Sequence, residues 1–108
     1  MSTDGECQSL SIRVDGTVIA VSGELDVASA PELDDLLRRT DGEAVTLDLS
    51  GVRFIDPAGL RVLLVAQRDI DARGGQLVIR KPSWQVRRLA QLSGTADQLG
   101  MEASAEAE

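Results

Sequence analysis

The chain has 108 residues with a formal net charge of -7; 43% of its residues are hydrophobic, 27% are charged, and none is histidine. This length fits one domain with a single core, and the composition is that of a globular protein rather than a disordered one. The negative charge and the scarcity of aromatic residues, limited to Phe54 and Trp84, exclude typical nucleic-acid binding and predict an aliphatic core.

The beginning of the chain is polar, and residues 1–7 are expected to form a leader outside the core. Cys7 is the single cysteine, so we interpret it as an incidental thiol rather than part of a disulfide or redox pair. The leader lacks the pattern of a signal peptide, and no segment approaches the roughly 20 apolar residues that cross a bilayer. We therefore expect a cytoplasmic protein without membrane insertion.

Residues 10–14 and 17–22 alternate apolar and polar side chains around Asp15-Gly16, a pattern that predicts a β-hairpin. Glu24-Leu25-Asp26 then forms a loop before a helix predicted over residues 28–39, which ends at Asp41-Gly42. The buried stripe of this helix is predicted to comprise Ala30, Leu33, Leu36 and Leu37.

The pattern of the central segment predicts a strand followed directly by a helix. Val45, Leu47 and Leu49 alternate with polar residues, and the apolar spacing becomes helical from Pro57 to about residue 72. Asp56 is placed to cap this helix, and proline is favoured at the first helical position. Gly74-Gly75 is expected to stop the helix.

The last predicted elements are a short strand at residues 77–79, covered on both faces, and a helix at residues 83–92 with Ser83 as its N-cap. Gly94 should close a core spanning about residues 8–94. Residues 95–108 form a predicted acidic tail, with helix extending at most to Met101. The order of these strands and helices along the chain predicts one α/β domain. Its mixed sheet, built from an N-terminal hairpin and parallel strands, is covered by helices.

The segment LDLSGVRFIDPAGLRVLL, residues 47–64, resembles the STAS domain of bacterial anti-sigma factor antagonists, and the resemblance extends from Gly23 to about Gly94. In phosphorylated members of this family, a kinase modifies a serine or threonine at the position that Ala58 occupies here. Alanine has no hydroxyl, so Ala58 cannot be phosphorylated. The resemblance implies a protein-binding module rather than an enzyme.

The resemblance also implies where a partner would bind. The candidate residues are Glu24, Asp26, Asp56, Pro57, Ala58, Gly59 and Arg61. Ala58 and Gly59 are expected to offer a smooth surface over the helix N-terminus, and Glu24 and Asp26 an acidic rim that pairs with an arginine of a partner. Capping and solvation are the structural alternatives for the carboxylates.

Four further features have simpler structural interpretations. Ser50, predicted to end the central strand near the same rim, is a possible alternative phosphosite but also an ordinary turn serine. Asp48 has no visible partner base for catalysis. Trp84 is expected to pack over the sheet edge, beside a basic patch of Arg80, Lys81, Arg87 and Arg88 that we interpret mainly as a solvated face.

The sequence contains no phosphate-binding glycine loop and no metal-ligand spacing, so it predicts neither cofactor, metal site nor enzymatic activity. The favoured function is that of an anti-sigma factor antagonist, which binds an anti-sigma factor of the GHKL kinase type and releases a sigma factor. The alternative is an adaptor that scaffolds a signalling assembly or a cytoplasmic transport complex and associates with other STAS proteins.

Overall fold

A computed structural model describes residues 10–40 and 44–101 of the chain. The elements in these ranges are, in chain order, β1 (Leu10–Asp15), β2 (Val18–Leu25), α2 (Ala30–Arg38), β3 (Ala44–Ile55), α3 (Pro57–Ala72), β4 (Gln76–Arg80) and α4 (Trp84–Ser93). The expectations for Cys7, for Asp41-Gly42 and for the end of the acidic tail fall outside the described residues.

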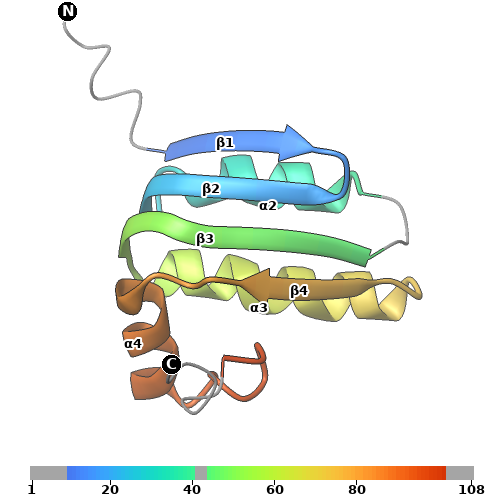
Figure 1. The fold of residues 1–108 in the computed structure, drawn as a ribbon. Helices are drawn as coiled ribbons and strands as arrows, with labels where there is room; N and C mark the ends of the chain where they lie inside the picture. The colour runs from blue at the N-terminus through green and yellow to red at the C-terminus, as the bar shows by residue number, and fades with distance from the viewer. Residues whose placement is uncertain (1–9, 41–43, 102–108) are drawn as a thin grey trace, which may run out of the picture.

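The strands form one mixed sheet in the order β1-β2-β3-β4 (Figure 1). β1 and β2 are the predicted antiparallel hairpin, with Leu10 opposite Gly23. β2 pairs with β3, and β3 with β4, in parallel, so each of these connections crosses over through a helix. The predicted fold class is confirmed.

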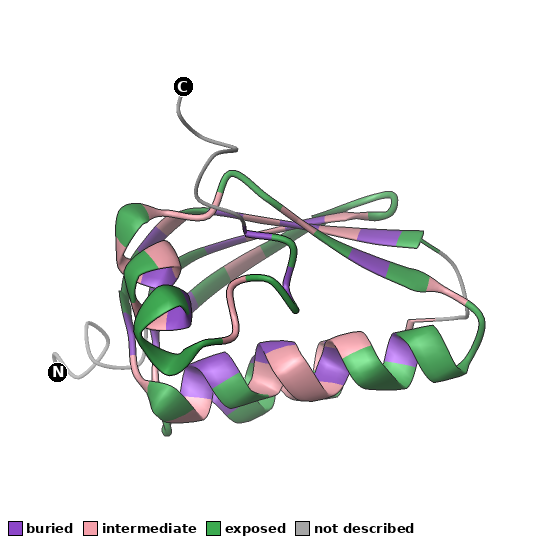
Figure 2. Cartoon of the chain, turned by 90° about the horizontal axis from the view of Figure 1, so that it is seen from below, coloured by how far each residue is buried: buried purple, intermediate pink, exposed green. Residues whose placement is uncertain are grey.

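Helices α2 and α3 lie side by side against one face of the sheet, while α4 packs beside the second half of β3 (Figures 1 and 2). Burial alternates along β2, where Ile19 and Val21 point into the core between more exposed neighbours. Among residues 10–40 and 44–101, no helix covers the opposite face of the sheet, which we call the open face (Figure 2). The prediction that residues 77–79 are covered on both faces is therefore wrong: β4 is an edge strand, and Val78 is 39% exposed.

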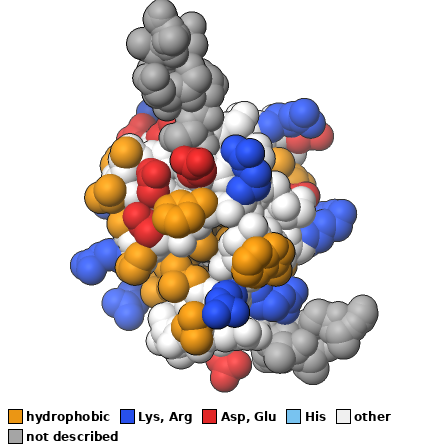
Figure 3. Space-filling model, turned by 90° about the vertical axis from the view of Figure 1, so that its left-hand side faces the viewer, with side chains coloured by type: hydrophobic (Ala, Val, Ile, Leu, Met, Phe, Trp, Pro, Cys, Tyr) orange, Lys and Arg blue, Asp and Glu red, His pale blue; other side chains and the backbone are white. Residues whose placement is uncertain are grey.

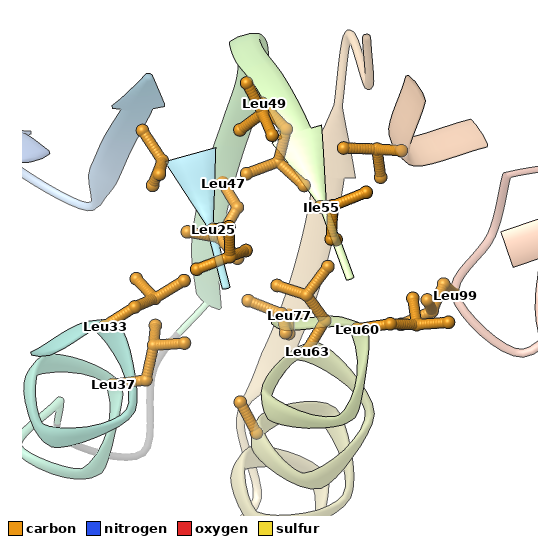
Figure 4. Packing of buried hydrophobic residues seen from close by; sticks show 14 of the residues in the cluster. Leu25, Leu33, Leu37, Leu47, Leu49, Ile55, Leu60, Leu63, Leu77 and Leu99 are labelled. Carbon is orange, nitrogen blue, oxygen red and sulfur yellow. The ribbon is translucent and has the colours of Figure 1, made fainter. Parts of the chain in front are cut away.

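The core is aliphatic, as predicted, and its centre consists of leucines from the sheet and from α2 and α3 (Figure 4). It extends further along the chain than expected. Gly94 ends α4 with a left-handed φ of 78°, yet Leu99 and Met101 beyond it are 3% and 2% exposed. Residues 96–100 form turns in place of the predicted helical extension.

Two strands run further than the sequence indicated. β2 includes Glu24 and Leu25, and β3 continues beyond Ser50 to Ile55 because irregularities in its pairing with β2 absorb extra residues. The helix predicted at residues 28–39 is shorter, since it begins only at Ala30. Within the described ranges, no helix combines the length and apolar character that crossing a membrane requires.

Candidate functional site

The rim is the end of the sheet where β2 and β3 end and where α2 and α3 begin. Asp56 occupies its centre as the N-cap of α3, with extended backbone at φ -115° and ψ 177°. One carboxylate oxygen accepts a hydrogen bond from the Gly59 N–H at 2.9 Å, which is the predicted cap. The other accepts from the Val27 N–H at 3.2 Å. Asp56 therefore also ties the β3–α3 junction to the β2–α2 loop.

Asp26 organises the neighbouring loop. Its carboxylate accepts hydrogen bonds from the backbone N–H groups of Ala28 and Ser29 and lies 3.0 Å from the Ser29 hydroxyl. The hydrogen bonds from Ser29, backbone first, hold the pKa of Asp26 below its ordinary value. This local network keeps residues 26–29 in a turn, which explains why α2 starts two residues later than predicted.

The first turn of α3 is only partly accessible. Pro57 and Arg61 are exposed, Ala58 is half-buried, and Gly59 is buried. A Cβ on Gly59 would lie 2.3 Å from the backbone oxygen of Leu25 in β2. The expectation that Gly59 offers a surface to a partner is therefore wrong, because Gly59 is buried. Its lack of a side chain lets α3 pack closely against β2.

Glu24 is exposed and is the last residue but one of β2, not a loop residue as predicted. It pairs in register with Phe54 of β3. Figure 3 looks onto the rim, where acidic side chains gather at one side of exposed apolar ones and basic side chains lie at the other sides. The structure thus brings Glu24, Asp26 and Asp56 to one end of the molecule.

Ser50 does not belong to the rim. Because β3 continues to Ile55, Ser50 lies within the strand on the open face, roughly 16 Å from Ile55 along the strand. Its hydroxyl donates to Asp48 at 2.7 Å. Hydrogen bonds from the Ser50 backbone and side chain, assisted by Lys81 and Arg80, lower the pKa of Asp48. A carboxylate with a lowered pKa is a weak base, so this pair does not resemble a catalytic site.

Sequence reasoning missed the apolar part of the rim. Trp84 was expected to be packed, but it is 68% exposed, and Phe54 is 49% exposed. Val27, in the loop held by Asp56, is 69% exposed. The single available signal was the position of Phe54 immediately before Ile55-Asp56, at the end of a strand.

Among the described residues, no group of three or more carboxylate and cysteine side chains is arranged to hold a metal ion. The rim instead consists of a capped helix N-terminus, a hydrogen-bonded turn and exposed apolar side chains. These features suit recognition of a protein.

Comparison with known proteins agrees with this geometry. The family profile described as "Mlab, STAS domain" matches residues 9–101. The chain belongs to the STAS domain family. The matched segment includes every element of the described fold, from β1 to α4.

Proteins similar to this STAS domain are named anti-sigma factor antagonists. The anti-sigma F factor antagonist of Paenibacillus polymyxa is 30% identical over 81 residues, which cover 71% of this chain and 69% of the relative. The anti-sigma-B factor antagonist of Listeria monocytogenes is 30% identical over 82 residues, covering 73% and 72%. The crystal structure of an anti-sigma factor antagonist from Mycobacterium paratuberculosis matches with a TM-score of 0.64 and 26% identity, covering 83% of this chain and 82% of that one.

Proposed function

We propose that this STAS domain is an anti-sigma factor antagonist that binds an anti-sigma factor of the GHKL kinase type and thereby releases a sigma factor. The names of its relatives support this role. Release follows from mass action, because each anti-sigma molecule held by the antagonist is withdrawn from the sigma factor. We further propose that the protein acts in the cytoplasm and has no enzymatic activity.

The observation that carries the proposal is the constellation at the rim. Asp56, Pro57, Ala58 and Arg61 lie at the start of α3, beside Glu24 and Asp26 of the neighbouring loop and strand. The carboxylates would pair with cationic groups of the partner and fix its orientation. Gly59 takes part indirectly, since it sets how closely α3 approaches β2.

Ala58 gives this antagonist a distinct regulation. In relatives that carry a hydroxyl at this position, a phosphate would add about -1.5 to -2 charge and three acceptor oxygens beside a fitted interface. Ala58 carries no group that accepts a phosphate, so the complex should persist when the kinase has nucleotide. Ser50 does not replace it, because its hydroxyl is bonded to Asp48 away from the rim. Control then comes from the amount of protein or from a competing partner.

Substitution at residue 58 tests this proposal. The Ala58→Glu variant should bind the anti-sigma kinase at least tenfold more weakly than the native protein, about 1.4 kcal/mol, because it places a charge in the interface. The control is Gln76→Glu, which adds the same charge at the opposite end of the sheet, where β4 begins. Equal affinity for both variants would contradict the assigned surface.

Ala58→Ser tests whether the hydroxyl alone is missing. Mixed with the kinase and nucleotide, this variant should gain one phosphate that the native protein does not gain, as measured by intact-protein mass. If Ala58→Ser remains unmodified while binding normally, the surrounding surface has also lost the features that a kinase requires.

The alternative is an adaptor that associates with other STAS proteins in a signalling assembly or a cytoplasmic transport complex. The observation that favours it is again Ala58, since a scaffold does not require a phosphorylatable residue. The two functions differ in partner. Retention of a transport ATPase or other STAS proteins by the tagged protein, without an anti-sigma kinase, would identify the adaptor.

A further inference from the structure

The two aromatic residues of the chain both project from the rim end of the molecule. Phe54, the last residue but one of strand β3, is 49% exposed, and Trp84, at the start of α4, is 68% exposed. Leu92, two turns further along α4, is 72% exposed. The buried core consists of aliphatic side chains, and both aromatic residues lie outside it. Clustered exposed apolar side chains commonly mark interaction sites.

These side chains border one groove between β3 and α4. Its lining comprises Phe54, Ile55, Trp84, Gln85, Arg88, Leu89 and Leu92. Positions 85, 88, 89 and 92 follow helical spacing, so they share one face of α4, while Val86 and Ala90 form the face buried in the core. Helix α4 therefore presents a second stripe, in which two leucines lie beside Gln85 and Arg88. Leu89 packs partly against the core, whereas Leu92 is exposed.

The volume of the groove indicates what kind of group it can hold. Its volume of about 260 Å³ is below the roughly 300–1,000 Å³ of typical small-molecule pockets, and it is open to solvent. It offers few polar groups to orient a ligand. A side chain of leucine or phenylalanine size, presented by another protein, fits this description better than a metabolite.

The charged residues near the groove indicate which group of the partner would lie beside that apolar side chain. Arg88 is the one charged residue in the lining, and Lys81 precedes α4 at the corner with β4. The acidic residues of the rim lie on the other side of Phe54, where Glu24 is its neighbour on β2. In a chain with a net charge of -7, this local excess of positive charge favours a carboxylate of the partner beside the apolar side chain.

We propose that the groove receives an apolar side chain flanked by a carboxylate from the anti-sigma partner; this inference rests on the proposed function. Ile55 lines the groove and directly precedes Asp56, so the groove is continuous with the surface around Ala58. One partner could therefore contact both Ala58 and Trp84 at the rim. Tryptophan and arginine are the residues most enriched among binding hot spots.

The test measures affinity for the anti-sigma kinase retained by the tagged protein. Trp84→Ala should weaken binding at least tenfold and Arg88→Glu at least fivefold, with normal unfolding midpoints because both side chains are exposed. The controls are Val14→Ala, which truncates an apolar residue 55% exposed on β1, and Arg68→Glu, which reverses an exposed charge on α3; both should bind normally.

The outcomes separate this inference from the proposed function. If Ala58→Glu weakens binding while Trp84→Ala and Arg88→Glu do not, the antagonist function stands and the groove is overturned as a docking site. If the native protein retains no anti-sigma kinase, both proposals fail. If Trp84→Ala instead converts a dimer into a monomer in sedimentation equilibrium, the occupant is a second copy of this chain and the inference is again overturned.

Discussion

Gly59→Ala should destabilise the protein, although replacing glycine by alanine within a helix normally stabilises it by about 1 kcal/mol. The added Cβ would lie 2.3 Å from the backbone oxygen of Leu25 and 2.9 Å from its Cγ. Side chains can rotate away from such a contact, but a backbone oxygen in the middle of the fold can move only with its strand. The same oxygen accepts a hydrogen bond from the Asp56 N–H at 3.3 Å, so its displacement also disturbs the start of α3.

The expected magnitude follows from these opposing effects. Overpacking costs about 1–3 kcal/mol, and the weakened hydrogen bond adds about 1 kcal/mol, against the gain of about 1 kcal/mol in helix propensity. The net loss is therefore about 1–3 kcal/mol. A loss of about 2 kcal/mol lowers the Tm by roughly 10 °C in a domain of this size.

Urea unfolding followed by circular dichroism measures this loss. The control is Ala58→Gly, the reverse change at the neighbouring helical position, which should cost no more than about 1 kcal/mol. If Gly59→Ala proves as stable as the native protein or more so, then α3 does not approach β2 as closely as described, and our reason for the buried glycine is wrong.

Three further predictions concern the cap, the open face and the end of the core. Asp56→Ala should lower the free energy of unfolding by about 1–2 kcal/mol, and Asp56→Asn by much less, because asparagine also caps helices; equal losses in urea unfolding would contradict the capping role. The lowered pKa of Asp48 stabilises the fold above pH of about 4, its ordinary range, and this contribution disappears as the pH falls through the folded-state pKa. Ser50→Ala should therefore raise the pKa of Asp48 in an NMR titration, and an unchanged value would exclude the hydroxyl as a cause. Leu99→Ala should cost about 2–4 kcal/mol in urea unfolding whereas Leu92→Ala changes stability by less than about 0.5 kcal/mol, and similar small effects would place Leu99 outside the core.

The sequence predicted those features that depend on neighbouring residues. Asp56-Pro57 defines the start of α3 through capping and proline geometry, both of which act within one helical turn. Ser83 likewise caps α4, accepting from the Val86 N–H as predicted. The hairpin is another local pattern, and its strands pair antiparallel as predicted. Its two-residue turn is Gly16-Thr17 rather than Asp15-Gly16, because Asp15 pairs with Val18.

Features that depend on distant contacts were predicted less well. The burial of Gly59 is determined by Leu25, 34 positions earlier in the chain, and no pattern around residue 59 indicates it. Ser50 was assigned to the rim because the strand appeared to end there, but the pairing with β2 carries β3 on to Ile55. The inclusion of Leu99 in the core similarly depends on tertiary packing, which composition does not reveal.

Trp84 illustrates a different kind of error. Large aromatic residues are mostly buried, so a packed side chain was the natural expectation. In the structure the buried face of α4 is occupied by the small residues Val86 and Ala90, which leaves Trp84 outside. The departure from the usual pattern coincides with the surface proposed to bind a partner, where local rules are most often broken.

The most direct test of the central claim is a pull-down of the tagged protein from a lysate of the cells that produce it, with and without adenosine triphosphate, followed by mass identification of retained proteins. Our account predicts that a GHKL-type anti-sigma kinase is retained in equal amount under both conditions and that the recovered bait carries no phosphate. Release of the kinase on addition of adenosine triphosphate, or retention of a transport ATPase or other STAS proteins without any kinase, would contradict it.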